Sequence, residues 1–507
     1  MRRALLALAL PLAGCAHLLV SSPAGHYEEG RAGPARLVVR QGLALAAVEG
    51  APEEIGAQLA ALTGGALRAL RDEFFELVPP APAERARALA AGLPDDHRRE
   101  LQALARGAGV PYGDALVANV IVDSACTAFV ASGANTASGE LLFARNMDFP
   151  PAHLLGPRTL VTLVRPAGKK AFVSIGWPGV TGVVSGMNED GLCAAVLINM
   201  GGRRGQGEAA PLTFVVREVL EACATVDEAR ALLRAREVAS GHFVFVADAS
   251  TGAIVAPGEP DRLPGLDGLL TCSNDAFAPE AGLQTDARAR ALSDLLQARR
   301  GALDLDGARA VLGGTYLDYI NAQAMVFEPA RRAVSLALGT TLRPAAVQGW
   351  TRLDLSRALA TGDLEQVEVR SLPGVTPAPH YKAHPYAGEA VDAAYVAGVL
   401  RHADALEADP EAHDLARAQG LAALSFQAGR RVEGAALDGL QGALAARLVA
   451  ALERLDRALD RDPTPAAAEA LERAAWAAVV FSVPLSPGQE RRRAALEARA
   501  RAARERA

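Results

Sequence analysis

The pattern of apolar and polar positions divides this chain into a middle region of mixed elements and a C-terminal region that is almost wholly helical. Short apolar runs bounded by turn residues predict strands; these runs are 37–48, 158–164, 170–175, 192–199, 242–248, 268–273, 321–328 and 333–339. Longer runs with helical spacing predict helices; these are 51–75, 83–93, 95–107, 211–223, 226–236 and 285–299. Helix pairs that alternate with antiparallel strands suit two packed sheets with helices outside, an α+β fold.

The first residues have the pattern of a targeting segment rather than of a folded element. Arg2 and Arg3 precede an apolar run that is too short to span a bilayer. The run ends in Leu-Ala-Gly-Cys15, which resembles a bacterial lipobox, so we expect residues 1–15 to be a lipoprotein signal and Cys15 to carry a lipid. Ala16 after the cysteine favours the outer membrane, facing the periplasm. An ordinary secretory signal is the alternative.

Composition shifts suggest how the rest of the chain is organised. Residues 16–45 are expected to form a tether, and residues 46–125 a mostly helical segment. The main core is expected at 126–345, followed by a proline-dense connector at 346–388. From residue 389 to 507 alanine, leucine, arginine and glutamate dominate, which predicts a small all-helical region. Its arginine-rich end is interpreted as a solvated helix face.

Charge and composition exclude several classes of function. The 52 basic and 58 acidic residues give a net charge of −6, so nothing suggests a nucleic-acid partner. The five cysteines lack the spacing of metal ligands, and none of the nine histidines lies in a zinc-binding pattern. We therefore expect neither a metal nor a cofactor.

The most informative stretch begins at Cys126 and predicts a β-hairpin. A β-prone run, a turn-rich segment at 132–139 and a second apolar run would bring Arg145 and Asp148 beside the thiol. A cation near a thiol favours the reactive thiolate, so Cys126 is a candidate nucleophile. A small buried hydrophobe is the alternative. Because residues three apart in a regular strand face opposite sides, we expect a bulge near Asn146 and Met147.

Several motifs in this chain resemble those of a known enzyme group. Cys126-Thr127 and Ala-Arg145-Asn146-Met-Asp148 resemble the two strands that open the catalytic chain of N-terminal nucleophile hydrolases of the penicillin acyltransferase, acid ceramidase and choloylglycine hydrolase type. Gly-Met-Asn-Glu-Asp-Gly-Leu at 186–192 is a further match, and weaker ones lie at 50–56 and 107–110. The resemblance implies a four-layer αββα sandwich preceded by a helical propeptide.

The same resemblance implies roles for individual residues. The bond between Ala125 and Cys126 would be cut by the protein itself, so that Cys126 supplies both the thiol and a free α-amine as proton acceptor. Arg145 would favour the thiolate and position the substrate, and Asp148 would hydrogen-bond the amine. The remaining implied catalytic residues are Asn199 and Asn274 as amide donors to the oxyanion, and Arg288, with Arg290 as its competitor. Asp275 departs from the family pattern, and the gap from Cys126 to Arg145 is longer than usual.

These expectations combine into one reading with two alternatives. The first is a self-processing hydrolase or acyltransferase that cleaves a small-molecule acyl amide, a linear C–N bond, through a thioester, with its two chains remaining associated. The second is a hydrolase of another lineage with a Cys126–His242 dyad. The third is a non-catalytic envelope lipoprotein that binds acylated ligands or holds an envelope partner through its helical tail. Cys193, Cys223 and Cys272 are interpreted as core residues, although an oxidising compartment would permit a disulfide.

Overall fold

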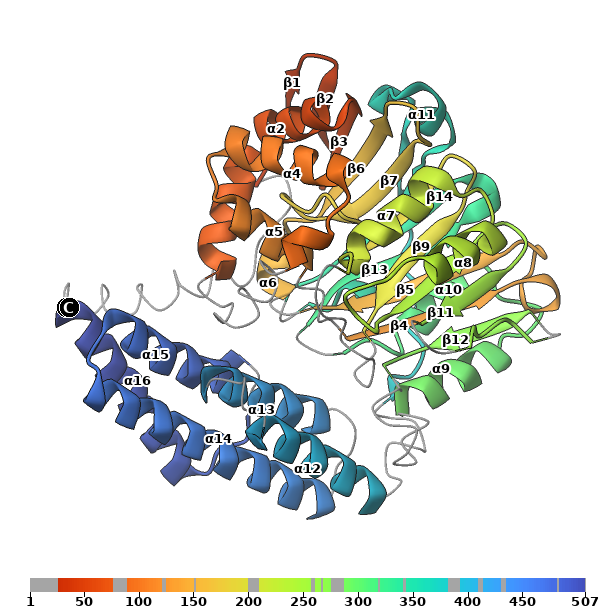
Figure 1. Ribbon diagram of the computed structural model, residues 1–507. Coiled ribbons are helices and arrows are strands. Elements are labelled where there is room, and N and C mark those ends of the chain that lie inside the picture. The colour runs from red at the N-terminus through yellow and green to blue at the C-terminus, as the bar shows by residue number, and fades with distance from the viewer. Residues whose placement is uncertain are drawn as a thin grey trace, which may run out of the picture. The chain divides into compact units, whose positions relative to one another are not determined.

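A computed structural model describes most of the chain after residue 25; the described residues are 26–75, 89–120, 125–149, 152–198, 209–256, 260–265, 268–274, 287–317, 320–340, 343–381, 393–408, 414–429, 435–480 and 483–506. They form a mixed α/β unit that ends at His380 and a helical unit whose main part begins at Tyr381 (Figure 1). The predicted lipid signal and Cys15 lie outside the described residues.

The mixed unit contains two sheets within the described part of the chain. The larger sheet has the order β1 (Gly30–Ala32), β2 (Ala35–Arg40), β3 (Leu43–Gly50), β6 (Leu160–Pro166), β7 (Phe172–Gly176), β8 (Ser185–Asn188), β9 (Cys193–Leu197), β10 (Phe243–Ala247) and β11 (Gly252–Val255). The smaller sheet has the order β12 (Leu269–Cys272), β4 (Ala125–Ala131), β5 (Leu142–Asp148), β13 (Asn321–Glu328), β14 (Ala333–Leu338), β15 (Trp350–Asp354) and β16 (Glu368–Leu372).

These sheets pack face to face and carry helices on their outer faces. The rings of Phe143 on β5 and Phe245 on β10 lie 5.0 Å apart between the sheets. Helices α7 (Leu212–Ala222) and α8 (Val226–Ala235) pack on the larger sheet. Helices α9 (Ala287–Gln297) and α10 (Leu305–Leu312) share a core with β4, β5 and β13 of the smaller sheet. The predicted αββα sandwich is therefore confirmed.

The segment before Cys126 contributes three strands to the larger sheet. We expected one strand at 37–48, but the chain reverses at Gln41 and Gly42, whose φ angles are 48° and 80°, so that β2 and β3 form a hairpin. Strand β3 then pairs in parallel with β6 from Ala44–Leu160 to Gly50–Pro166. The predicted tether at 16–45 is too long, because from residue 30 the chain belongs to the sheet.

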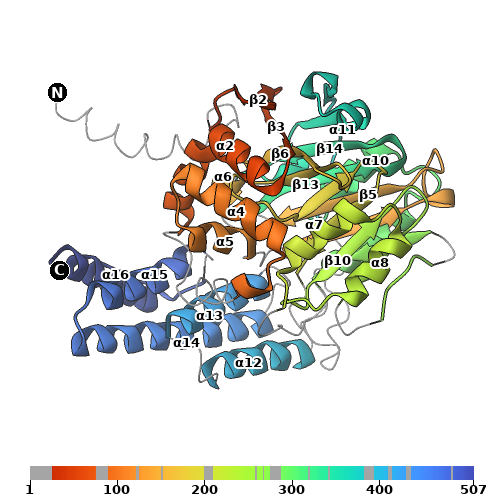
Figure 2. The ribbon, with the colours of Figure 1, turned by 45° about the horizontal axis from the view of Figure 1, so that its top comes forward.

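Three helices follow these strands and lie beside one another in both views (Figures 1 and 2): α2 (Pro52–Phe75), α4 (Asp95–Ala108) and α5 (Tyr112–Val120). Helices α2 and α4 approach closely at two glycines. A Cβ atom at Gly56 would come within 2.2 Å of the Glu100 carbonyl oxygen, and one at Gly107 within 2.7 Å of the Ala60 side chain. The crossing therefore explains a glycine in each of the two weaker motifs. The predicted helix at 83–93 lies mostly outside the described residues.

A buried group of charged side chains joins α4 to α7, and we call it the α4–α7 cluster (His97, Glu100, Arg217, Glu221 and the partly exposed Lys169). The terminal nitrogens of Arg217 donate to the two carboxylate oxygens of Glu100, each at 2.6 Å. Arg217 Nε donates to Glu221 at 2.7 Å, and Glu221 also contacts His97 at 3.2 Å and Lys169 at 2.8 Å. The cluster links elements from either side of Cys126.

The region expected to be a connector, 346–388, is largely part of the fold. Residues 350–372 form β15, helix α11 (Ser356–Thr361) and β16, which extend the smaller sheet beyond β14. Trp350 is buried there, with the guanidinium of Arg309 over its ring at 5.5 Å. The predicted core boundary at 345 was therefore too early; the strands carry only five residues each, which makes them hard to detect by periodicity.

The helical unit confirms the all-helical C-terminal region. Its described helices are α12 (Ala393–Ala408), α13 (Asp414–Gly429), α14 (Ala435–Arg461), α15 (Pro465–Val480) and α16 (Pro487–Arg506). They share a core of leucine and alanine side chains such as Leu421, Leu448 and Leu471. None of the helices in the described ranges combines the length and the hydrophobicity that a bilayer crossing requires.

Candidate active site

The β4–β5 hairpin fixes which side chains share a face with Cys126. Cys126 lies opposite Met147, and Ala128 lies opposite Arg145, in an uninterrupted antiparallel register. Because opposite and alternate residues share a face, Arg145 and Met147 lie on the side of the thiol. Asp148 lies on the other side. The expected bulge in β5 is wrong; the irregularity is instead in β13, between Asn321 and Gln323.

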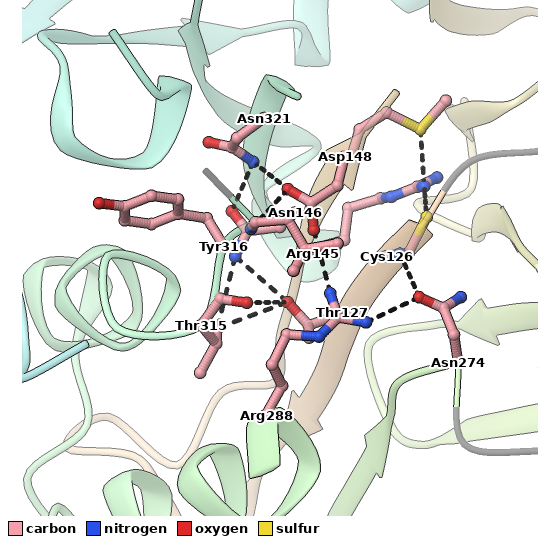
Figure 3. A network of polar contacts seen from close by, with 12 residues as sticks. Cys126, Thr127, Arg145, Asn146, Asp148, Asn274, Arg288, Thr315, Tyr316 and Asn321 are labelled. Atoms are coloured by element: carbon pink, nitrogen blue, oxygen red, sulfur yellow. Dashed lines mark hydrogen bonds and ion pairs between the residues drawn. The ribbon is translucent and has the colours of Figure 1, made fainter. Parts of the chain in front are cut away.

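The guanidinium of Arg145 is fully buried and faces the sulfur of Cys126. Its Nη2 donates to Cys126 Sγ and to Met147 Sδ, both at 2.9 Å (Figure 3). Its Nη1 donates to Ser185 Oγ at 2.7 Å and to the Val184 carbonyl at 3.1 Å, both on the larger sheet. A cation in this position favours the thiolate form of a cysteine.

Asn274 accepts a hydrogen bond from the backbone nitrogen of Cys126. Cys272 on β12 pairs with Ala128, so Asn274, two residues further, comes alongside Cys126. The Cys126 N–H donates to Asn274 Oδ1 at 2.7 Å, and Arg288 Nη2 donates to the same oxygen at 2.9 Å. Asn274 Nδ2 donates to the Ile198 carbonyl at 2.8 Å. Asn274 thus acts as an acceptor toward residue 126 in this structure, and its expected role as oxyanion donor stays a prediction.

Asp148 is connected to the same nitrogen through other side chains. Its Oδ1 accepts from Asn321 Nδ2 at 2.8 Å and from the Leu317 N–H at 3.1 Å, and Arg288 Nη1 lies 3.2 Å from Oδ2. Figure 3 shows Arg288 between Asp148 and Asn274. Burial raises the pKa of Asp148 to about 6, although Arg288 and the hydrogen-bond donors act to lower it. In this structure, where the Cys126 nitrogen is still part of a peptide bond, Asp148 is connected to it through Arg288 and Asn274; the expected direct bond to the amine of the cut protein stays a prediction.

The structure does not describe every residue that we predicted for the site. It brings together Cys126, Arg145, Asp148, Asn274 and Arg288, and it places the Ala125 backbone opposite Asp148. Asn199 and Asp275 lie outside the described residues, and so does the side chain of Arg290.

The sequence did not predict two residues that form hydrogen bonds with the side chains of the site. Ser185 binds Arg145, and Asn321 binds Asp148 and accepts from the Ala346 N–H at 2.8 Å. Asn321 was recognised only as a strand start; its position opposite Asp148 depends on the bulge in β13. No local signal in the sequence distinguishes Ser185, because its contact is made across the two sheets.

The other described cysteines do not have the surroundings of Cys126. Cys193, Cys223 and Cys272 are buried, as expected for core residues. Burial raises the pKa of Cys193 well above its ordinary value and that of Cys223 to about 11, so both thiols stay protonated. In the described part of the chain, no group of His, Cys, Asp and Glu side chains converges as metal ligands do.

One family model and several solved structures match part of this chain. Residues 134–267 match the family model of acyl-coenzyme A:6-aminopenicillanic acid acyl-transferase, a stretch that contains Arg145 and Asp148. A search of curated protein sequences gives no match. The family-model match supports a place for this chain in the superfamily of N-terminal nucleophile hydrolases.

Three of the solved structures that match part of this chain are the following. The N-acylethanolamine-hydrolyzing acid amidase ortholog of Caenorhabditis elegans is 19% identical, with a TM-score of 0.34, covering 40% of this chain and 93% of that chain. Penicillin V acylase from Agrobacterium tumefaciens is 16% identical, with a TM-score of 0.31, covering 50% and 100%. A mutant form of the conjugated bile acid hydrolase from Clostridium perfringens is 12% identical, with a TM-score of 0.33, covering 50% and 98%.

Proposed function

We propose that this protein is a self-processing cysteine N-terminal nucleophile enzyme that cleaves or transfers the acyl group of a linear amide. The proposal rests on one observation: the sulfur and the backbone nitrogen of residue 126 each have a separate hydrogen-bond partner. Arg145 contacts the sulfur, and Asn274 contacts the backbone nitrogen. The family-model match supports acyl transfer, because the family is named for an acyltransferase.

Activation would occur at the peptide bond between Ala125 and Cys126. The sulfur of Cys126 attacks the Ala125 carbonyl carbon, the C–N bond breaks, and the thiol proton passes to the departing nitrogen. The product is a thioester between the two residues, which water hydrolyses to the carboxylate of Ala125 and a free thiol. Cys126 then carries a free α-amine, and Asn274 Oδ1 already lies 2.7 Å from that nitrogen.

The mature site would use the same two atoms in turnover. The α-amine takes the thiol proton as the sulfur attacks the substrate carbonyl, the resulting α-ammonium passes that proton to the departing amine, and the acyl group stays on sulfur as a thioester. Water or an acceptor amine then takes the acyl group, which distinguishes a hydrolase from an acyltransferase. Arg145 favours the thiolate, and Asn199 remains our proposed donor to the oxyanion.

Association of the two chains after the cut is part of the proposal. The N-terminal chain would contribute β1 to β3 to the larger sheet, and Glu100 would stay paired with Arg217. In addition, Asn119 Oδ1 on α5 accepts from the N–H groups of Thr181 and Gly182 at 2.7 and 2.8 Å. These contacts support the proposal that the cut chain stays in place. We further propose that a lipid on Cys15 anchors the enzyme to the outer membrane, facing the periplasm.

The decisive experiment is intact-mass and N-terminal analysis of the purified wild type beside Cys126→Ala. We expect a chain that begins at Cys126 in the wild type alone. Cys272→Ala is the matched control, because this buried thiol lies on the neighbouring strand β12 and should leave the cut unaffected. An active protein whose residue 126 is still bonded to residue 125 would contradict the proposal.

The same samples separate the two alternatives. An enzyme with a Cys126–His242 dyad would stay uncut and would lose activity in His242→Ala. A binding protein would stay uncut and inactive in every variant. A panel of amides with varied acyl chains, tested on the cut protein, then identifies the acyl group.

A further inference from the structure

We propose that Ser185 is a positioning residue for the chemistry at Cys126, because its hydroxyl oxygen holds the guanidinium of Arg145 in the orientation that faces the sulfur. The inference rests on the proposed function, since it assigns a role within the same site. Ser185 itself does not contact the sulfur in this assignment; it acts through Arg145.

The hydrogen bonds of Arg145 show how the guanidinium is aimed. Nη1 donates to Ser185 Oγ and the Val184 carbonyl, and Nη2 donates to the sulfur atoms of Cys126 and Met147. Each terminal nitrogen carries two N–H groups in a planar fork, so each N–H has one acceptor. Because the fork is rigid, the acceptors at Nη1 determine where Nη2 points.

The acceptors at Nη1 belong to a rigid part of the larger sheet. Ser185 is fully buried and pairs with Ala195 of β9, and the Val184 carbonyl also accepts from the Val196 N–H at 2.9 Å. The next residue, Gly186, is packed so closely that a Cβ atom there would lie 2.5 Å from the Val173 carbonyl oxygen. The hydroxyl of Ser185 is therefore an acceptor for Arg145 that the sheet holds in a fixed position.

While the Cys126 thiol is protonated, the sulfur acceptors at Nη2 hold the guanidinium less firmly than oxygen does. Sulfur is a weak acceptor, whereas a hydroxyl or carbonyl oxygen forms a stronger charge-assisted bond. Without the Ser185 hydroxyl, one Nη1–H of a buried cation would lose its partner. The guanidinium would then rotate to recover an oxygen acceptor, and the contact with Cys126 Sγ would be lost.

The test measures thiolate formation at Cys126 directly, by ultraviolet absorbance across a pH range, and needs no substrate. Full-length Ser185→Ala is compared with wild type, and each spectrum is corrected with the same protein carrying Cys126→Ser. Samples are matched for their state of cleavage by intact mass. We expect the midpoint of thiolate formation to rise by about one pH unit in Ser185→Ala, because a cation has moved away from the thiol.

Ser335→Ala provides the matched control. Ser335 is a fully buried serine in the smaller sheet whose hydroxyl has no hydrogen-bond partner among the described residues. The substitution removes the same atom from the same kind of strand, so a general structural effect would appear in both variants. Equal midpoints for Ser185→Ala and Ser335→Ala would overturn the proposal.

Two further readouts distinguish positioning from structure. In Arg145→Met, adding Ser185→Ala should leave the midpoint unchanged, because Ser185 acts only through Arg145; an additional shift would contradict this route. On amide substrates, Ser185→Ala should lower kcat about tenfold with KM unchanged. If wild type neither cuts itself nor turns over any amide, the proposed function fails, while the titration still decides the role of Ser185.

Discussion

Two buried charge networks in this molecule use arginine in different ways. In the α4–α7 cluster, Arg217 faces two carboxylates and all three of its nitrogens donate to an oxygen, two to Glu100 and one to Glu221. At the candidate site, the Nη2 of Arg145 faces two sulfur atoms. The first arrangement neutralises buried charge, and the second presents a cation to a thiol.

The difference appears in the titration of the acidic partners. Burial acts to raise the pKa of Glu221, but Arg217, together with His97 and Lys169, holds it far below its usual range. Burial dominates at Asp148 and raises its pKa to about 6. Glu221 is therefore charged at any working pH, whereas Asp148 changes its charge within the range where an enzyme operates. We infer that the cluster supports the fold and that the site has kept groups poised to react.

The largest expected effect is on stability and follows from breaking the cluster. Arg217→Met leaves the buried Glu100 without this cation and removes one of the partners of Glu221, which should lower the free energy of unfolding by about 3–5 kcal/mol. Urea denaturation of the full chain measures it. The control is Arg230→Met, since Arg230 pairs with the exposed Asp227 and with Asp261, and a loss of less than about 1 kcal/mol is expected there. Equal losses of unfolding free energy in the two variants would show that the α4–α7 cluster stabilises the fold no more than a partly exposed ion pair does.

The next effect should be large in activity and small in stability. Arg145→Met removes the cation beside the sulfur, so kcat/KM should fall by about 10²–10³-fold, the magnitude typical of losing one electrostatic group at a reacting centre. Arg145 contacts two sulfur atoms, a hydroxyl and a carbonyl, so its removal leaves no buried carboxylate without a partner. The loss of stability should therefore be smaller than in Arg217→Met. Kinetics and urea denaturation on the same samples check both parts. If Arg145→Met lowers the free energy of unfolding but leaves the kcat/KM of the folded protein unchanged, Arg145 supports the fold and not the chemistry.

The smallest expected effect is on the pH profile. Asp148 is protonated below about pH 6, so kcat/KM should decline as the pH falls through about 6 rather than through its ordinary 3.8. Because the folded pKa is raised, this group makes folding less favourable as the pH rises from about 4 to 6. Asn321→Ala removes a donor to the carboxylate, so the acid limb should move to higher pH.

Gln323→Met is the matched control for that change. Gln323 is buried on the same strand, two residues further, and donates instead to Thr159 Oγ1 at 2.8 Å. The acid limb of the kcat/KM profile of Gln323→Met should coincide with that of wild type. Should Asn321→Ala and Gln323→Met shift the limb equally, the effect would belong to β13 in general and not to Asp148.

Much of the fold could be predicted from the sequence because the pattern is local. The sheets and most helices follow from runs of apolar residues and turn residues, and the four-layer arrangement was implied by the family resemblance. The β2–β3 hairpin was missed because its turn, Gln41-Gly42, is a weak signal within one apolar run. Strands β15 and β16 were missed because they lie in a region whose composition resembles a linker.

The candidate site was predictable to the extent that a hairpin register determines it. Cys126 and Arg145 share a face for that reason, and Arg288 was chosen over Arg290 by motif spacing. The acceptor role of Asn274 was not predictable, since it depends on which end of an amide faces Cys126 and Arg288. Ser185 and Asn321 depend on contacts between sheets and on a bulge, and single-sequence periodicity contains neither.

The parallel pairing of β3 with β6 has a consequence for how this protein can be made. Without the first 125 residues, β6 would become the border of its sheet, with a row of unsatisfied peptide groups ready to recruit another molecule. A gene fragment that starts at codon 126 would therefore encode an aggregation-prone polypeptide. Synthesis as a single precursor avoids this, because the covalent link supplies β3 at an effective concentration that a separately added peptide would not reach.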